Sequence, residues 1–185
     1  MIKNNEVPTK FVWLDLEMTG LDPSVDRILE VAVVITDSNL NELASYHSLI
    51  NYGEDYINGL LLKNPFWVSR PDGRKKILKE LKSGKNASMV DYDLWVLVAD
   101  NFKEGEPVYL AGNSIRVDRA FIDEQLQDFA SLLHYRMLDV SSFKLWWLAN
   151  GQSEYKKKEL HRALDDIHES IAELKHYSDN IKFND

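Results

Sequence analysis

Four carboxylates and one histidine are the residues of this chain best suited to chemistry. Carboxylate oxygens are hard ligands that suit Mg²⁺ or Mn²⁺, and a histidine can accept a proton near neutral pH. An Asp-x-Glu after an apolar run is common by chance. Here, however, acidic residues and a histidine are distributed over three separate segments, and this combination indicates a two-metal nuclease. They are Asp15 and Glu17 in FVWLDLEMTGLDP, Asp118 in AGNSIRVDRAF, and His161 and Asp166 in HRALDDIHESIAEL.

The first carboxylate pair follows a predicted strand. The run from Phe11 to Leu14 is apolar, which predicts a buried strand. Residues two apart on a strand point to the same side, so Asp15 and Glu17 project together at the strand end. Two adjacent carboxylates repel each other unless a cation lies between them.

Asp118 falls on the apolar face of a predicted helix that starts near Ile115. It lies one turn after Ile115 and one turn before Ile122, inside the same apolar stripe. A carboxylate turned toward a core is costly without a partner. The partner is either a metal ion or an arginine such as Arg119 or Arg162.

The last predicted helix, 162–177, has its own buried stripe, and the helical period places Asp166 at the edge of that stripe. Asp165 then points to solvent, so Asp166 is the preferred ligand. His161 lies off that face, and we expect it at the helix start or on the preceding loop, where a base can approach a substrate. The alternative is an ordinary surface histidine beside the lysines at 156–158.

The rest of the pattern predicts a mixed α/β sheet, because three strands are followed by alternating helices and strands. Ser114 can cap the helix that follows it, and the stretch 51–59 reads as irregular. With 185 residues, the chain is long enough for one domain, 1–185, and too short for two ordinary ones. Further strands are predicted at 28–35, 43–50, 108–111 and 135–140, and further helices at about 74–82, 90–102 and 141–149.

Composition excludes several classes of function. The net charge of −8 argues against a protein that coats long DNA or RNA, although a short nucleic acid still fits. The absence of cysteine excludes disulfides, thiol catalysis and cysteine-ligated zinc. No apolar run is long enough to cross a membrane. The opening MIKNNEVPTK lacks the apolar core of a secretory signal, so we expect a cytoplasmic protein.

Five segments of the chain resemble one family. The resemblance is to the oligoribonucleases, in the histidine-containing branch of the DEDD exonucleases, and it covers most of the chain outside 51–101. It implies a ribonuclease H-like exonuclease fold, with a central mixed five-stranded sheet flanked by helices. The segments, in order, are FVWLDLEMTGLDP, RILEVAVVITD, AGNSIRVDRAF, LHYRMLDVSSFKLW and HRALDDIHESIAELKHY.

The resemblance implies a metal-dependent 3′→5′ exoribonuclease, a phosphodiester hydrolase that degrades dinucleotides and slightly longer RNA to nucleoside 5′-monophosphates. It implies that two Mg²⁺ or Mn²⁺ ions are held by Asp15, Glu17, Asp118 and Asp166. Neutral His161 would help to deprotonate the attacking water. Activity would therefore fall at acid pH, where the histidine and the carboxylates take up protons.

The resemblance also implies contacts with short single-stranded RNA. Leu21 would wedge against the terminal bases; its alternative role is simple packing of the turn. Trp67 would stack on a base; its alternative is a role in the core or on the surface. Tyr135 and Arg136 would come from the second subunit of a homodimer and close off the far end of the substrate. The full set of matched positions is Leu21, Trp67, Asn113, Ser114, Tyr135, Arg136, Ser141 and Lys144.

The chain departs from the family pattern in three places, one of which is a slightly shorter stretch before His161. Arg116-Val117 stand where the family commonly has Gly-Gln. A basic run from Arg70 to Lys85 is either a solvated amphipathic helix or an added RNA-binding surface. Two other functions therefore stay open: a broader 3′→5′ exonuclease on longer RNA or single-stranded DNA, and a non-catalytic protein of the same fold that binds small nucleotides.

Overall fold

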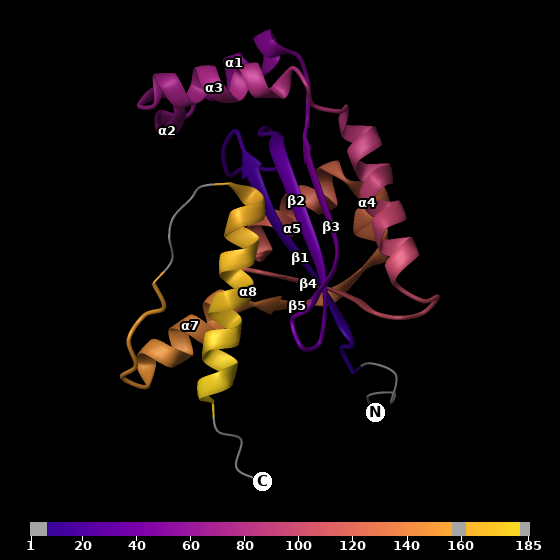
Figure 1. Ribbon diagram of the computed structural model, residues 1–185. Coiled ribbons are helices and arrows are strands. Elements are labelled where there is room, and N and C mark those ends of the chain that lie inside the picture. Colours follow the sequence, from indigo (N-terminus) through magenta and orange to yellow (C-terminus); the bar gives the residue numbers. More distant parts are fainter. Residues whose placement is uncertain (1–6, 157–161, 182–185) are drawn as a thin grey trace.

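A five-stranded mixed sheet forms the centre of the structure, a computed structural model that describes residues 7–156 and 162–181 (Figure 1). The strands lie in the order β3-β2-β1-β4-β5. β1 pairs antiparallel with β2, and β2 with β3, whereas β4 runs parallel to β1 and β5 parallel to β4. The predicted mixed five-stranded sheet is confirmed. The bounds are β1 Lys10–Met18, β2 Ile28–Asp37, β3 Glu42–Leu49, β4 Val108–Gly112 and β5 Leu133–Asp139.

Helices flank this sheet, and one of them replaces a predicted irregular segment. α1 begins after Gly53, whose φ of 92° favours glycine, and it buries Ile57 and Leu61. The prediction of an irregular stretch at 51–59 is therefore wrong. Within 7–156 and 162–181, no helix combines the length and the apolar character that crossing a bilayer requires. The bounds are α1 Glu54–Leu61, α2 Pro65–Val68, α3 Pro71–Leu81, α4 Ala87–Asn101, α5 Arg116–Gln125, α6 Gln127–Leu132, α7 Val140–Ala149 and α8 Ala163–Asn180.

Alternate residues of β1 face opposite sides of the sheet. Leu14 and Leu16 join a core with α4, α5 and α6, whereas Trp13 packs into a second core with α7 and α8. Asp15 and Glu17 share the parity of Trp13, so they point to the side that α8 covers. The period of the strand therefore decides which helix the first carboxylate pair meets.

α1, α2 and α3 form a separate helical layer beyond one end of the sheet (Figure 1). Ile57 of α1 and Ile77 and Leu81 of α3 pack with Leu29 of β2 in a third apolar cluster. The basic residues of α3 lie outside this contact, with Lys76 exposed. The structure thus agrees with the interpretation of this segment as an amphipathic helix.

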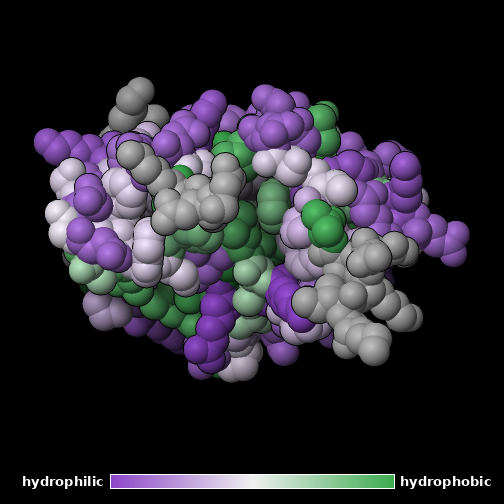
Figure 2. All heavy atoms as spheres, turned by 90° about the horizontal axis from the view of Figure 1, so that it is seen from below, coloured by the Kyte–Doolittle hydropathy of each residue, from purple (hydrophilic) through white to green (hydrophobic). Residues whose placement is uncertain are grey.

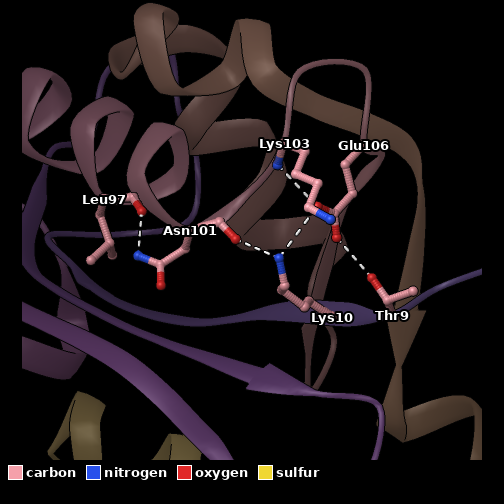
Figure 3. A network of polar contacts seen from close by, with 6 residues as sticks. All are labelled: Thr9, Lys10, Leu97, Asn101, Lys103 and Glu106. Carbon is pink, nitrogen blue, oxygen red and sulfur yellow. Dashed lines mark hydrogen bonds and ion pairs between the residues drawn. The ribbon is translucent and has the colours of Figure 1, made fainter.

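A polar network ties β1 to the loop after α4 at the N-terminal end of the strand (Figure 3). The ammonium of Lys10 pairs with Glu106 at 3.3 Å and donates to the carbonyl of Asn101. Glu106 also accepts hydrogen bonds from the Thr9 hydroxyl at 2.7 Å and from the Lys103 backbone N–H at 3.0 Å. These contacts fix the start of the strand that carries the first carboxylate pair.

The buried carboxylate of Asp91 on α4 generates a stability prediction. It accepts the backbone N–H groups of Asp128 at 3.1 Å and Phe129 at 2.8 Å, at the start of α6. Asp91→Ala leaves both groups without this partner, so the free energy of unfolding should fall by about 2–4 kcal/mol. Thermal unfolding should show a Tm lower by roughly 5–10 °C.

The matched control for this prediction is Asp93→Ala, on the same helix. Asp93 is half-buried; it pairs with Lys85 at 2.6 Å and accepts the Tyr46 hydroxyl at 2.9 Å, and because both partners can bond to water instead, its loss should cost only about 1 kcal/mol. Equal losses of Tm in the two variants would contradict the role given to Asp91.

Candidate active site

Three carboxylates from distant parts of the chain meet beside β1. Asp15 and Glu17 on β1 and Asp166 in the first turn of α8 each present an oxygen, and these oxygens all lie within 4.8 Å of one another. Asp166 is half-buried whereas Asp165 is exposed, as the helical period predicts. The fifth predicted residue, His161, lies outside the described residues.

Asp118 on α5 reaches the same group through the backbone of β1. Its Oδ1 accepts the N–H of Leu16 at 3.1 Å, and the residue is 7% exposed. The alternative, an arginine partner, is wrong for both candidates: Arg119 pairs with Asp123, and Arg162 pairs with carboxylates of β2 and α3. The structure therefore brings all four predicted carboxylates together.

Burial and mutual repulsion shift the acid equilibria of this group. Desolvation, followed by the charges of Asp118 and Glu17, raises the pKa of Asp15 to about 8. Desolvation also raises the pKa of Asp118 to about 7, although hydrogen bonds from backbone N–H groups oppose the shift. Such perturbed carboxyls in a cluster mark a candidate functional site.

The donor set fits a divalent cation. Several carboxylate oxygens converge at short range, and a cation between them would relieve the repulsion that otherwise favours bound protons. Oxygen ligands of this kind suit hard metals such as Mg²⁺ and Mn²⁺. The group formed by Asp15, Glu17, Asp118 and Asp166 is called the carboxylate cluster below.

Ser114 lies at the turn between β4 and α5, with a φ of 51° in the left-handed region. Its backbone N–H donates to Asp139 Oδ1 at 3.0 Å and to Ser141 Oγ at 2.9 Å, and the two serine hydroxyls are 3.2 Å apart. The prediction that Ser114 caps the following helix is wrong. α5 has Ile115 at its N-cap and no side-chain cap, because the Ser114 hydroxyl is turned toward α7.

Both the nitrogen and the oxygen of the Asn113 side-chain amide form hydrogen bonds within the chain. The Nδ2 group donates to Ser170 Oγ at 2.8 Å and to Glu173 Oε2 at 3.1 Å, and Oδ1 accepts the Ser141 hydroxyl at 3.2 Å. Ser170 in turn donates to the carbonyl of Asp166 at 2.8 Å. Asn113 therefore links the β4–α5 turn to α7 and to the turn of α8 that carries Asp166.

The helical layer of α1 to α3 is attached to the end of β1 near the carboxylate cluster. Trp67 donates its indole N–H to the carbonyl of Met18 at 3.4 Å, and Asn64 donates to the carbonyl of Thr19 at 2.8 Å. Trp67 is half-buried, so neither a pure core nor a pure surface role describes it. Leu21 is 78% exposed in the loop after β1, so it is not buried by turn packing.

A hollow of about 340 Å³ joins this helical layer to the cluster. Its walls include Glu17, Trp67, Arg70 and Arg162. A larger hollow, of about 820 Å³, lies between α4, the loop after it and β4, and none of the four carboxylates lines it. Of these two hollows, only the smaller one is lined by a member of the carboxylate cluster, Glu17.

The remaining predicted contact residues lie on β5 and α7. Tyr135 is 72% exposed on the outer strand β5, and the Arg136 guanidinium lies 5.1 Å from the centre of its ring. Neither residue lines the hollow beside Glu17. Lys144 of α7 pairs with Glu154.

Sequence reasoning missed Glu30 on β2. The residue is 3% exposed and lies directly opposite Glu17 in the β1–β2 register. Its carboxylate contacts His47 and Arg162. The available signal was one acidic residue inside the otherwise apolar run ILEVAVVI.

The raised pKa of Asp15 predicts how stability depends on pH in the metal-free protein. In the folded protein the pKa of Asp15 is about 8, whereas an ordinary aspartate has a pKa of 3.8. The tighter binding of the proton by the folded state stabilises the fold. This stabilisation is complete below pH 3.8 and is lost as pH rises through about 8. Asp15→Asn should be more stable than wild type at pH 8, by roughly 1–3 kcal/mol.

Thermal unfolding of metal-free protein across pH tests this prediction. The wild-type Tm should fall more steeply toward alkaline pH than that of Asp15→Asn, and added Mn²⁺ should raise the wild-type Tm most. Asp165→Asn, which changes an exposed neighbour of the cluster, is the control. Parallel curves for wild type and Asp15→Asn would contradict the effect assigned to Asp15.

Sequence comparison connects this geometry to known enzymes. Residues 12–58 and 88–174 match the family described as exonuclease. The chain is 38% identical to the mitochondrial oligoribonuclease of Mus musculus, in an alignment that covers 98% of this chain and 77% of that protein. It is 36% identical to the oligoribonuclease of Pseudomonas entomophila, and that alignment covers 95% and 98% of the two chains.

Solved structures with a similar fold include two exonucleases I. The zinc-bound enzyme of E. coli in complex with single-stranded DNA has a TM-score of 0.64 at 16% identity, over 93% of this chain and 41% of that one. The enzyme of Methylocaldum szegediense has a TM-score of 0.65 at 16% identity, over 92% and 40%. The chain spans about two fifths of these proteins, and the likeness shows a shared ribonuclease H-like exonuclease fold.

The exonuclease match extends over more than half of the chain, and the relatives align with it almost from end to end. Both findings agree with a cluster of acidic side chains that fits a divalent metal ion. The chain belongs to the oligoribonuclease family of exonucleases, which are hydrolytic nucleases.

Proposed function

We propose that this chain is a 3′→5′ exoribonuclease that hydrolyses dinucleotides and slightly longer RNA to nucleoside 5′-monophosphates. The observation that carries the proposal is the carboxylate cluster, assembled from β1, α5 and α8 in a member of the oligoribonuclease family. Residues 1–185 would form a single exonuclease domain.

The cluster would hold two divalent cations, Mg²⁺ or Mn²⁺. When bound, they supply a Lewis acid that stabilises charge on the scissile phosphate and on the departing 3′ oxygen. Asp15, Glu17 and Asp166 would contribute oxygens from short range, and Asp118 would join them from its place against the backbone of β1. Because burial raises the pKa of both Asp15 and Asp118, protons compete with the cations for these oxygens.

His161 is the proposed general base, which takes a proton from the attacking water in its neutral form. Trp67 would stack on a base, and its hydrogen bond to Met18 presets the ring beside Glu17. Exposed Leu21 would wedge against the terminal bases. Asn113 and Ser114 would contact the substrate from the β4–α5 turn, where hydrogen bonds within the chain, to Ser141 in both cases, hold the two residues in place.

Tyr135 and Arg136 would act in the site of a second subunit of a homodimer, where they would close off the far phosphate, with Ser141 and Lys144 assisting. One feature supports self-association through this region: Tyr135 and, on α7, Leu145 are at least 70% exposed. On the face seen from below in Figure 2, hydrophobic residues are visible between hydrophilic ones.

Activity on longer strands is the second candidate function. One observation favours it, because Arg70 lines the hollow beside Glu17 and stacks on Phe66 at 3.9 Å. Lys76 lines the same hollow while it pairs with Glu80, whereas Lys82 and Lys85 pair with acids elsewhere. We propose the cytoplasm as the compartment, although the mouse relative is named mitochondrial.

A length series of 5′-labelled RNA, from a dinucleotide to a long single strand, tests the proposed reaction with Mg²⁺ or Mn²⁺. Cleavage of the dinucleotide should be fastest and fall with length. His161→Ala should lower kcat by roughly 10²–10⁴-fold through loss of the base, and Asp15→Ala should abolish turnover. Asp165→Asn is the control, with activity near wild type.

The same series separates the other candidates. Equal or faster cleavage of long strands, reduced by Arg70→Ala, would establish the broader exonuclease. If the protein bound dinucleotides in the presence of metal but cleaved RNA of no length, it would be a nucleotide-binding protein and not a nuclease.

Subunit complementation tests the role of Tyr135 and Arg136. If Arg136 acts in the partner's site, Asp15→Ala and Arg136→Ala subunits should each be nearly inactive alone. Mixed and reassociated in equal amounts, they should recover about a quarter of wild-type activity, because each mixed dimer contains one intact site. No recovery despite exchange of subunits would place Arg136 in the site of its own chain or outside it.

A further inference from the structure

Arg162 joins three parts of the structure at the start of α8. Its Nη2 lies 3.5 Å from Glu30 Oε1 on β2, and its Nη1 lies 3.6 Å from Glu80 Oε2 on α3. One guanidinium therefore connects α8 to the sheet and to the helical layer of α1 to α3. An arginine suits this position because its planar fork can serve two carboxylates at once.

Glu30 needs such a partner because of its position beside the carboxylate cluster. Its side chain is 4% exposed, and it lies directly opposite Glu17 across the β1–β2 pair. Like charges directly opposite on neighbouring strands are destabilising, and the charge of Glu30 adds to the field on Asp15. His47 Nε2, 2.7 Å from Glu30 Oε1, is a second partner.

Arg162 is also attached to the cluster through its backbone. As the N-cap of α8, it accepts the N–H of Asp166 on its carbonyl at 2.9 Å. Its side chain is thus fixed to β2 and α3, while its main chain fixes the residue that contributes an oxygen to the cluster. Arg162 lines the hollow beside Glu17 as well, so the same contacts hold a wall of that hollow.

We propose that Arg162 is a positioning residue for the metal site. Through Glu30 and Glu80, it sets where the first turn of α8 stands against β1, and hence how closely Asp166 approaches Asp15 and Glu17. The inference rests on the proposed function, because it assumes that the cluster binds a divalent cation. Partners outside the ligand set commonly change metal affinity by roughly 10–100-fold.

Calorimetric titration of metal-free protein with Mn²⁺ tests the inference without any turnover. Arg162→Ala should weaken Mn²⁺ binding by about tenfold or more. Arg162→Lys should recover part of this loss, because one ammonium can pair with either carboxylate but does not reproduce the fork. Lys175→Ala, which removes an exposed cation elsewhere on α8, should bind Mn²⁺ as wild type does.

A double-mutant cycle with Glu80 tests the arm that reaches α3. Glu80→Gln should weaken Mn²⁺ binding less than Arg162→Ala does, because Arg162 still pairs with Glu30 in this variant. The variant carrying both changes should match Arg162→Ala, because the second change then removes a contact that is already lost. Fully additive effects would overturn the role of this arm.

Two further outcomes are decisive. If Arg162→Ala lowers the Tm of the metal-free protein and leaves Mn²⁺ affinity at the wild-type value, Arg162 only stabilises the fold and the inference is wrong. If the wild-type protein binds no Mn²⁺, the proposed function itself fails, and this result is distinct from a loss confined to Arg162 variants.

Discussion

Electrostatic repulsion within the carboxylate cluster is the constraint on which the rest of this structure depends. Asp15, Glu17 and Asp166 place oxygens within 4.8 Å of one another, and Asp118 is buried beside them. Charges at such range in a poorly solvated place favour either bound protons or a bound cation. A fold that keeps them together must supply the stability elsewhere, as sites that sacrifice stability for function generally do.

That stability comes from apolar cores on both faces of the sheet, which fix β1 from two sides. Leu14 and Leu16 are buried against α4 to α6, and Trp13 is buried against α7 and α8, with its indole donating to Thr36 at 3.0 Å. β1 therefore has little freedom to separate its carboxylates. Because interiors are close-packed, a small shift of α8 along this surface would move Asp166 directly.

The helical layer of α1 to α3 has a different relation to the cluster. It packs through its own apolar contacts and is attached to β1 by Asn64 and Trp67. The family match leaves out residues 59–87, which contain most of this layer. The alignments with the oligoribonucleases, in contrast, cover 95% or more of the chain.

The sequence by itself determined the local relations, because the periods of strand and helix depend only on neighbouring residues. It gave the shared side of Asp15 and Glu17, and the half-buried place of Asp166 beside exposed Asp165. Local patterns failed where a short segment depended on its surroundings. α1 formed where apolar contacts with α3 and β2 were available, and the Ser114 hydroxyl turned to Ser141 instead of capping α5.

The grouping of the four carboxylates was expected from the combination of residue types and from resemblance to the oligoribonucleases, and not from spacing, since Asp15 and Asp166 lie at opposite ends of the chain. Only the tertiary structure decided that Arg162 pairs with Glu30 and Glu80. Asp118 accepts a hydrogen bond from the backbone of β1 and does not pair with Arg162. The physical reason is that these partners meet through strand order and helix packing. Both are set by the folded core as a whole, so no local period encodes them.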